Sequence, residues 1–275
     1  MPNMKIFANS PVIASLLLIG SILFSSGCAV NPVSGESDFV LLSEDQEIAI
    51  GRENHAEIIK RYGLYKDQKL QDYIQGVGER LAAVSHRSNL IYRFTILDSR
   101  EVNAFALPGG YIYITRGLLA YLNNEAELAA VLGHEIGHVT ARHGVRQQTA
   151  ATAGGILASV LASQTGVPGA GNVFNAIGTA LVRGYGREHE LESDRLGAEY
   201  LARSGYDPLA MLEVIRVLKD QEVYDRELAK REDREPRVYH GVFSTHPYND
   251  ARLQQVVGRA QVLQKQNGLN HINRV

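Results

Sequence analysis

Two histidines four residues apart flank a glutamate near the middle of the chain, in the segment HEIGH at 134–138. Residues four apart on a helix share one face, so the imidazoles of His134 and His138 could reach one metal ion. Glu135 lies beside that face, where its carboxylate would contact a metal-polarised water rather than the metal. A catalytic zinc takes three protein ligands and keeps a fourth position for water. The pattern predicts two zinc ligands and a general base, with a third ligand elsewhere.

The third ligand is not close to the first two in the sequence. A further histidine six residues after His138 would complete one known type of zinc site, but that position is Gly144. His143 falls one residue short, and we expect it to interact with the C-terminal dipole of the helix. Gly137 is expected to keep the helix surface low and to leave space for a substrate backbone.

Two acidic residues downstream also lie four apart on a predicted helix, Glu190 and Asp194. Glu190 would complete a His-His-Glu site, and Asp194 would accept the remaining N–H of a ligand imidazole. The stretch contains further acidic residues, so Glu188 and Glu192 remain alternative ligands at this point. An uncharged segment at 149–182 separates the two predicted helices and could return the second against the first.

Composition narrows the class of protein. The chain has 275 residues, of which 45% are hydrophobic and 21% charged, with a formal net charge of −2. These values are typical of a globular domain, and the near-neutral charge argues against a nucleic-acid partner. Cys28 is the only cysteine, so neither an internal disulfide nor a cysteine-rich zinc site is possible.

The first 27 residues have the features of a signal peptide, with a short apolar run at 12–24. Cys28 follows Gly27 directly, and this arrangement resembles a bacterial lipobox, in which the cysteine is lipidated. An ordinary exported protein with an incidental cysteine is the alternative. We expect a lipid anchor at Cys28 and a tether over 28–42. Ala29 after the cysteine resembles lipoproteins of the outer membrane, which predicts a location on its periplasmic side.

The mature chain is predicted to be mostly helical with a small sheet. Ser43 and Gln46 form a capping-box pattern at the start of a helix over 43–63. Alternating residues at 91–98 and 111–115 predict two strands of a small antiparallel sheet. Further helices are predicted at 67–84, 124–143 with Asn124 as N-cap, 187–203, 208–230 with Asp207 as N-cap, and 245–266. The uncharged segment 149–182 is either a hairpin of two small-residue helices or a flap facing lipid or substrate.

Four motifs occur in a fixed order: NAFALPGGYIYITRGLL, LAAVLGHEIGHVTARH, EHELESDRLGAEYLARSGYDP and STHPYNDAR. Together they resemble the bacterial zinc metallopeptidases related to HtpX and the CAAX prenyl proteases, and in particular their periplasmic lipoprotein branch. The resemblance covers most of 40–260. It implies an α+β, zincin-like domain over 43–275 and one Zn²⁺ per chain. It also implies Glu190 as the third ligand, with Asp194 behind a ligand histidine.

Four further residues join the candidate site, two of them through the resemblance. His246 and Arg252 match a segment near the active site, where the histidine can approach the zinc or stabilise an oxyanion, as could the arginine. From the residues alone His246 would be interpreted as a helix N-cap. Asn103 and Ala104, beside an expected edge strand, fit a role in pairing with an extended substrate, and otherwise form part of a turn.

The predicted function is that of a zinc-dependent endopeptidase acting on unfolded or misassembled proteins of the cell envelope. One alternative is a chaperone-like outer-membrane assembly factor whose zinc site is blocked by His246. Another is an integral-membrane protease that uses 149–182 as a membrane hairpin. The three predictions differ in whether Glu135 performs chemistry and in whether the chain needs detergent once it is cut at Cys28.

Overall fold

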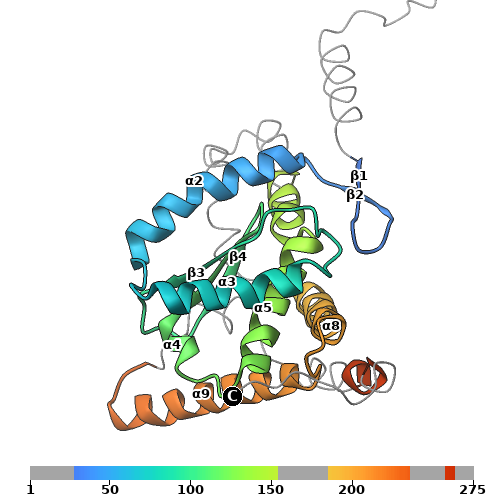
Figure 1. Ribbon diagram of the computed structural model, residues 1–275. Helices are drawn as coiled ribbons and strands as arrows, with labels where there is room; N and C mark the ends of the chain where they lie inside the picture. The colour runs from blue at the N-terminus through green and yellow to red at the C-terminus, as the bar shows by residue number, and fades with distance from the viewer. Residues whose placement is uncertain (1–27, 154–184, 236–257, 264–275) are drawn as a thin grey trace, which may run out of the picture.

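A three-stranded sheet lies against the helix that carries the two histidines (Figure 1). The computed structural model describes residues 28–153, 185–235 and 258–263. The named elements are, in order, β1 (Cys28–Val30), β2 (Ser37–Phe39), α2 (Glu44–Tyr62), α3 (Gln68–Ala82), β3 (Arg93–Leu97), β4 (Ala104–Leu107), β5 (Tyr111–Thr115), α4 (Arg116–Leu119), α5 (Glu125–Thr140), α8 (Arg187–Arg203) and α9 (Ala210–Arg231). The described chain is mostly helical with two small sheets, as predicted.

The larger sheet is mixed rather than antiparallel. β5 lies in the middle, with β3 parallel on one side and β4 antiparallel on the other. The predicted antiparallel pairing of 91–98 with 111–115 is therefore wrong. The segment between them forms β4 and turns back through Gly109 and Gly110, whose φ angles are +79° and +87°. β4 occupies one edge of β5, so β3 pairs with the other edge. There β3 runs parallel to β5.

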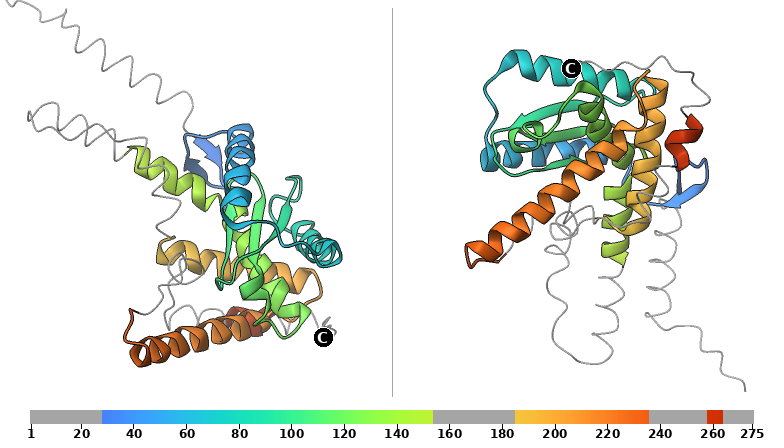
Figure 2. Two further views of the ribbon diagram at one scale, coloured as in Figure 1. Left: turned by 90° about the vertical axis from the view of Figure 1, so that its left-hand side faces the viewer. Right: turned by 90° about the horizontal axis from the view of Figure 1, so that it is seen from below.

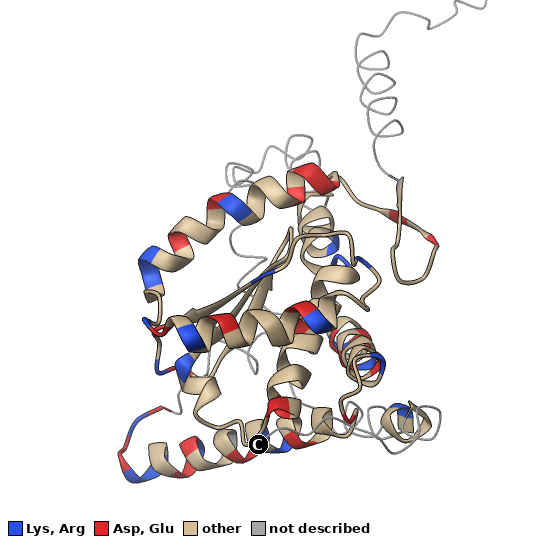
Figure 3. Cartoon of the chain, viewed as in Figure 1, with Lys and Arg blue, Asp and Glu red and all other residues tan. Residues whose placement is uncertain are grey.

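Both faces of the sheet are covered, and the sequence of β5 shows why. Ile112 and Ile114 point into the main core, which α3 and α5 share. Tyr111 and Tyr113 point to the other face and pack against the apolar side chains of α2. This alternation is the period of a strand that is buried on both sides. Figure 3 shows almost no charge on the sheet, whereas α2 and α9 carry many charged residues.

Among the described helices, α5 and α8 make the most extensive contact (Figure 2). A Cβ atom on Gly137 would lie 3.0 Å from Ser193 Cα, and one on Gly197 would lie 3.0 Å from the backbone nitrogen of His134. Small residues are therefore needed for the two backbones to approach this closely. The expectation that Gly137 leaves space for a substrate is wrong, because α8 occupies that space.

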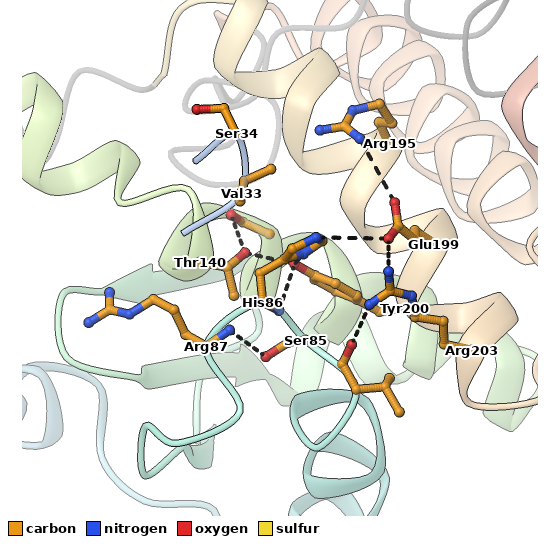
Figure 4. A network of polar contacts seen from close by, with 12 residues as sticks. Val33, Ser34, Ser85, His86, Arg87, Thr140, Arg195, Glu199, Tyr200 and Arg203 are labelled. Atoms are coloured by element: carbon orange, nitrogen blue, oxygen red, sulfur yellow. Dashed lines mark hydrogen bonds and ion pairs between the residues drawn. The ribbon is translucent and has the colours of Figure 1, made fainter. Parts of the chain in front are cut away.

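A second contact holds α8 to the end of α5 (Figure 4). The hydroxyl oxygen of Tyr200, on α8, is 3.0 Å from Thr140 Oγ1 and 2.7 Å from His86 Nδ1. His86 belongs to the loop after α3, so three segments meet at one buried hydroxyl. Glu199, the residue before Tyr200 on α8, pairs with Arg203 and lies 3.9 Å from His86 Nε2. These contacts fix the rotation of α8 about its axis.

Helix α5 ends earlier than the sequence predicts. Its last residue is Thr140 rather than 143, and Arg142 adopts a left-handed conformation with φ +55°. Such a conformation costs a non-glycine residue about 1–3 kcal/mol. The Arg142 guanidinium offsets this cost by donating to the carboxylate of Glu47 and, over 2.7 Å, to the Leu42 carbonyl. The chain then enters a new helical segment that the structure describes over 143–153.

Several predicted helix starts are confirmed. Ser43 and Gln46 form the capping box of α2, and the Asn124 side chain accepts from the Glu127 backbone at the start of α5. The predicted helix 187–203 is α8. Asp207 caps a turn just before α9, accepting from Leu209 N at 2.9 Å, so α9 begins later than predicted.

Parts of the predicted organisation lie outside the described residues. These parts are the signal peptide (1–27), most of 149–182 and most of the helix 245–266, of which 258–263 is helical. Within the predicted tether, β1 and β2 pair as an antiparallel hairpin. Among the described helices, none combines the length and the hydropathy needed to cross a bilayer.

The buried carboxylate of Glu47 provides a test of how the end of α5 is held. Glu47 is 1% exposed and accepts from both Arg87 and Arg142. Glu47→Ala would leave two buried guanidinium groups without their shared carboxylate. We expect it to lower the free energy of unfolding by about 3–5 kcal/mol in urea denaturation.

Glu44 is the matched control, because it also pairs with Arg87, at 2.7 Å, but its side chain is half-exposed. Glu44→Ala should cost about 1 kcal/mol or less. Equal losses in the two variants would contradict the anchoring role of Glu47.

Candidate metal centre

Three potential ligand atoms converge between α5 and α8. His134 and His138 come from α5 and Glu190 from the first turns of α8, and all three side chains are buried. The two Nε2 atoms are 3.0 Å apart, and each lies 3.5 Å from a carboxylate oxygen of Glu190. Tetrahedral zinc with bonds of about 2.0–2.2 Å requires ligand atoms roughly 3.3–3.5 Å apart. The two distances to Glu190 match this spacing, and the two Nε2 atoms lie slightly closer together than it, so the donor set fits a zinc ion with a small adjustment of the imidazoles.

The charges around His134 favour a cation at this position. Asp194, one turn after Glu190 on α8, places Oδ1 2.9 Å from His134 Nδ1. Burial alone lowers the pKa of His134, but the hydrogen bonds and charges of Asp194 and Glu190 outweigh it and raise the pKa to about 10. The same carboxylates stabilise a proton or a metal ion on the imidazole. With Nδ1 bonded to Asp194, the Nε2 atom of His134 remains directed at the centre.

The other histidine is oriented by a chain of groups. His138 Nδ1 lies 2.8 Å from His143 Nδ1, and His143 Nε2 lies 3.0 Å from Glu192 Oε2. Burial lowers the pKa of His143, while the hydrogen bond from His143 lowers the pKa of Glu192. A neutral His143 can accept the N–H of His138 while donating its own N–H to the carboxylate. This chain fixes the tautomer in which Nε2 of His138 faces the centre.

Sequence reasoning missed this role of His143. The sequence predicted a continuous helix over 124–143, with His143 at its C-terminal dipole. The early end of α5 and the left-handed Arg142 bring His143 back over His138 instead. Glu192 pairs with His143, and Glu188 is exposed to solvent. Glu190 is thus the acidic residue of this stretch that faces the two histidines.

Aromatic rings close one side of the centre. The ring of Tyr185 stacks on His138 with centroids 4.0 Å apart, and His189 stacks on His143 at 4.3 Å. Burial raises the pKa of Tyr185, and the nearby charges of Glu135 and Glu190 raise it further, so the phenol stays neutral. No sequence signal pointed to Tyr185, because its role depends on how α8 approaches α5.

Glu135 follows His134 on α5 and is 1% exposed. It lines a hollow between α5 and α9 together with His134 and Asp194. A carboxylate in this position borders both the candidate metal centre and the space that a substrate would enter. That is the placement a general base needs.

The predicted substrate-pairing residues lie at the edge strand of the described sheet. Asn103 directs its backbone to β5, because its N–H donates to Thr115 Oγ1 and its carbonyl accepts from Thr115 N at 2.9 Å. In an antiparallel ladder the bonding direction alternates, so Ala104 and Ala106 direct their backbone groups away from β5. Ala106 also lines a small hollow that includes His138 and Tyr185.

The remaining predicted residues fall at or beyond the limits of the described chain. His246 and Arg252 lie outside the described residues. Cys28 is the first described residue and begins β1.

A model of peptidase family M48 matches residues 68–260, well over half of the chain. The chain belongs to peptidase family M48. Membership of this family classes it as a metalloprotease, a hydrolase of peptide bonds. The family match begins at α3 and covers the sheet and both helices that supply the candidate ligands.

Relatives of this chain include beta-barrel assembly-enhancing proteases and mitochondrial metalloendopeptidases. The chain is 32% identical over 268 residues to the beta-barrel assembly-enhancing protease of Yersinia pestis, covering 90% of this chain and 52% of the relative. The protein of the same name in Escherichia coli K12 is 30% identical over 247 residues, covering 86% and 48%. The mitochondrial metalloendopeptidase OMA1 of Arabidopsis thaliana is 36% identical over 142 residues, covering 52% and 29%. The chain thus spans about half the length of the assembly-enhancing proteases that it matches.

The His143–Glu192 pair provides a test of the centre that does not depend on catalysis. Groups that orient a ligand imidazole typically contribute 10–100-fold to metal affinity. We therefore expect His143→Leu to weaken zinc binding by about that factor in a competition assay with a chromogenic chelator. His143→Gln should recover part of the affinity, because its amide oxygen can accept the N–H of His138.

The matched control is His189→Phe, which keeps a ring against His143 without touching the histidine ligands. It should leave zinc affinity within about 2-fold of the original value, since packing alone is changed. A folded His143→Leu variant that binds zinc as tightly as the unmodified protein would refute the orienting role.

Proposed function

We propose that this chain is a zinc-dependent endopeptidase, with zinc held by His134, His138 and Glu190. The convergence of these three buried ligand atoms, with Glu135 beside them, is the observation that carries the proposal. When bound, zinc acts as a Lewis acid that polarises a peptide carbonyl and acidifies a water molecule. Asp194 and His143 hold the ligand imidazoles in the tautomer that exposes Nε2.

Glu135 performs the proton transfers in this proposal. Its carboxylate accepts a proton from the attacking water and later delivers it to the nitrogen of the departing amine. Burial favours the first of these transfers, because a desolvated carboxylate is less stable in its charged form and therefore accepts a proton more readily than an exposed one. Positioned general bases of this kind typically contribute 10²–10⁴-fold to the rate.

The substrate is proposed to bind as an added strand. The outward backbone groups of Ala104 and Ala106 on β4 can pair with an extended peptide that then passes His138. Only a locally unfolded polypeptide exposes its backbone in this way. This requirement favours unfolded or misassembled proteins as substrates, and the relatives named beta-barrel assembly-enhancing protease support proteins of the cell envelope.

The proposed location follows from the N-terminal sequence. Lipidation at Cys28 would hold the chain on the periplasmic side of the outer membrane through the tether at 28–42. The β1–β2 hairpin immediately after Cys28 would then place the catalytic domain close to the membrane surface. Misassembled outer-membrane proteins would be within its reach, so the proposed role is quality control.

The alternative of an assembly factor with a blocked zinc site receives support from the words "assembly-enhancing" in the names of the relatives. In that case His246 would occupy the position needed by water, and Glu135 would have no proton to transfer. The two functions therefore differ in their dependence on Glu135.

Glu135→Gln separates the two functions. This substitution keeps the size of the side chain and removes the base, so we expect zinc content to stay at one per chain while casein hydrolysis falls by about 10²–10⁴-fold. Zinc is measured by elemental analysis and hydrolysis by release of labelled peptides. The matched control is Glu188→Gln, an exposed residue near the start of α8, which should leave both values unchanged.

Two results would contradict the proposal. Absence of zinc from both the unmodified protein and Glu135→Gln would exclude the metal centre. Zinc binding without casein hydrolysis in the unmodified protein, with the biological role preserved in Glu135→Gln, would favour the assembly factor.

A further inference from the structure

An apolar hollow opens between α5 and α9, directly beside the candidate metal centre. It has an empty volume of about 330 Å³, including its open mouth. Two of the residues that line it, His134 and Glu135, also belong to the candidate metal centre. Among the described residues, the rest of the lining is Asp194 and six apolar side chains: Ala130, Val131, Met211, Val214, Ile215 and Leu218.

The apolar wall is one face of α9. Met211, Val214, Ile215 and Leu218 follow the i, i+3, i+4, i+7 spacing of a single helix face. Each is at most 6% exposed, while Figure 3 shows charged residues along the outer side of the same helix. α9 thus turns its apolar face to α5 without filling the space next to His134. Close packing is the rule in protein interiors, so a hollow at this place requires an explanation.

Helix α8 sets the position of this wall. A Cβ on Gly197 would lie 2.6 Å from Met211 Cε, so the glycine allows Met211 to pack directly on α8. Asp194, on the same helix, already accepts from His134 at 2.9 Å. A molecule entering the hollow therefore meets the hydrocarbon side chains of α5 and α9 together with Glu135 beside the candidate metal centre.

We propose that this hollow binds an aliphatic side chain of the substrate residue adjoining the scissile bond. The proposal rests on the endopeptidase function proposed above. The scissile carbonyl carbon would lie beside His134 and Glu135. The two substrate residues on either side of the scissile bond are then within about one residue length of this point, roughly 3.5 Å along an extended chain. His134 and Glu135 line the hollow and also belong to the centre. A substrate side chain next to the scissile bond can therefore reach this apolar space.

The chemistry of the lining selects the occupant. A lysine or arginine would bury its charge among aliphatic side chains, which is costly without a partner. Asp194 does not provide that partner, because its carboxylate is bonded to His134. The lining matches aliphatic side chains, namely those of valine, leucine, isoleucine and methionine. We therefore expect every preferred cleavage site to have one of these residues at a fixed position next to the scissile bond.

Two substitutions change the hollow in opposite directions. Val214→Leu fills it, and Leu218→Ala enlarges it. Cleavage sites of the full-length, zinc-loaded protein are mapped by mass spectrometry on a peptide library made from a proteome. A single methylene in such a pocket changes kcat/KM by about 10–200-fold. We expect Val214→Leu to change the ratio of kcat/KM for leucine to that for alanine at the flanking position by about 10-fold or more, in favour of alanine. Leu218→Ala should change the preference at this position towards phenylalanine.

Val223 provides the control on the same helix, since it is 50% exposed and does not line the hollow. Val223→Leu should keep the original preference. The inference is overturned if the unmodified protein shows no aliphatic preference at either flanking position. It is also overturned if Val214→Leu and Leu218→Ala retain the preference of the unmodified protein.

A binding measurement separates this inference from the endopeptidase function. Amino-acid hydroxamates chelate zinc and present one side chain, so they need no cleavage. Calorimetry should show leucine hydroxamate binding about 10-fold or more tightly than glycine hydroxamate, with the ratio reduced in Val214→Leu. Preserved selectivity in a protein that cleaves no peptide would contradict the endopeptidase function alone. Equal binding of the two hydroxamates would contradict the hollow.

Discussion

The close contact of α5 with α8 is the constraint on which the rest of the site depends. The two backbones approach because Gly137 faces Ser193 and Gly197 faces His134. A larger side chain at these points would push α8 outward, and Glu190 would move away from both histidines. The same contact delivers Asp194 and Glu192, which orient the two imidazoles. Ligand position and ligand orientation therefore have one common cause.

A second property of the site is that its buried charges occur in compensated groups. Asp194 and Glu190 favour a cation at His134, while Glu192 holds the neutral His143 in one tautomer. Removing one member leaves another buried charge without compensation, which costs more than an exposed pair would. Around these groups the sheet and the apolar face of α9 provide low-polarity surroundings, in which each charge acts more strongly than in water.

Local sequence patterns predicted the helices and the residues that meet between them, because periodicity and capping act within a few residues. His134, His138 and an acidic ligand on α8 could be proposed because α5 and α8 each have a regular pattern, and the family resemblance singled out Glu190 among the acidic residues of α8. The mixed sheet and the role of His143 could not be predicted in this way. They depend on contacts between distant segments: β4 occupying one edge of β5, and Glu47 of α2 holding Arg142 in a left-handed conformation.

Glu190 is the proposed third ligand, supplied by α8 from a distant part of the sequence. Zinc affinity of Glu190→Ala against Glu188→Ala tests this assignment most directly, because the two residues lie in the same turn of α8 and only Glu190 faces the histidines. Glu190→Ala is expected to bind zinc at least 100-fold more weakly than the unmodified protein, whereas Glu188→Ala should bind it with unchanged affinity. Normal zinc binding by a folded Glu190→Ala protein would contradict this assignment.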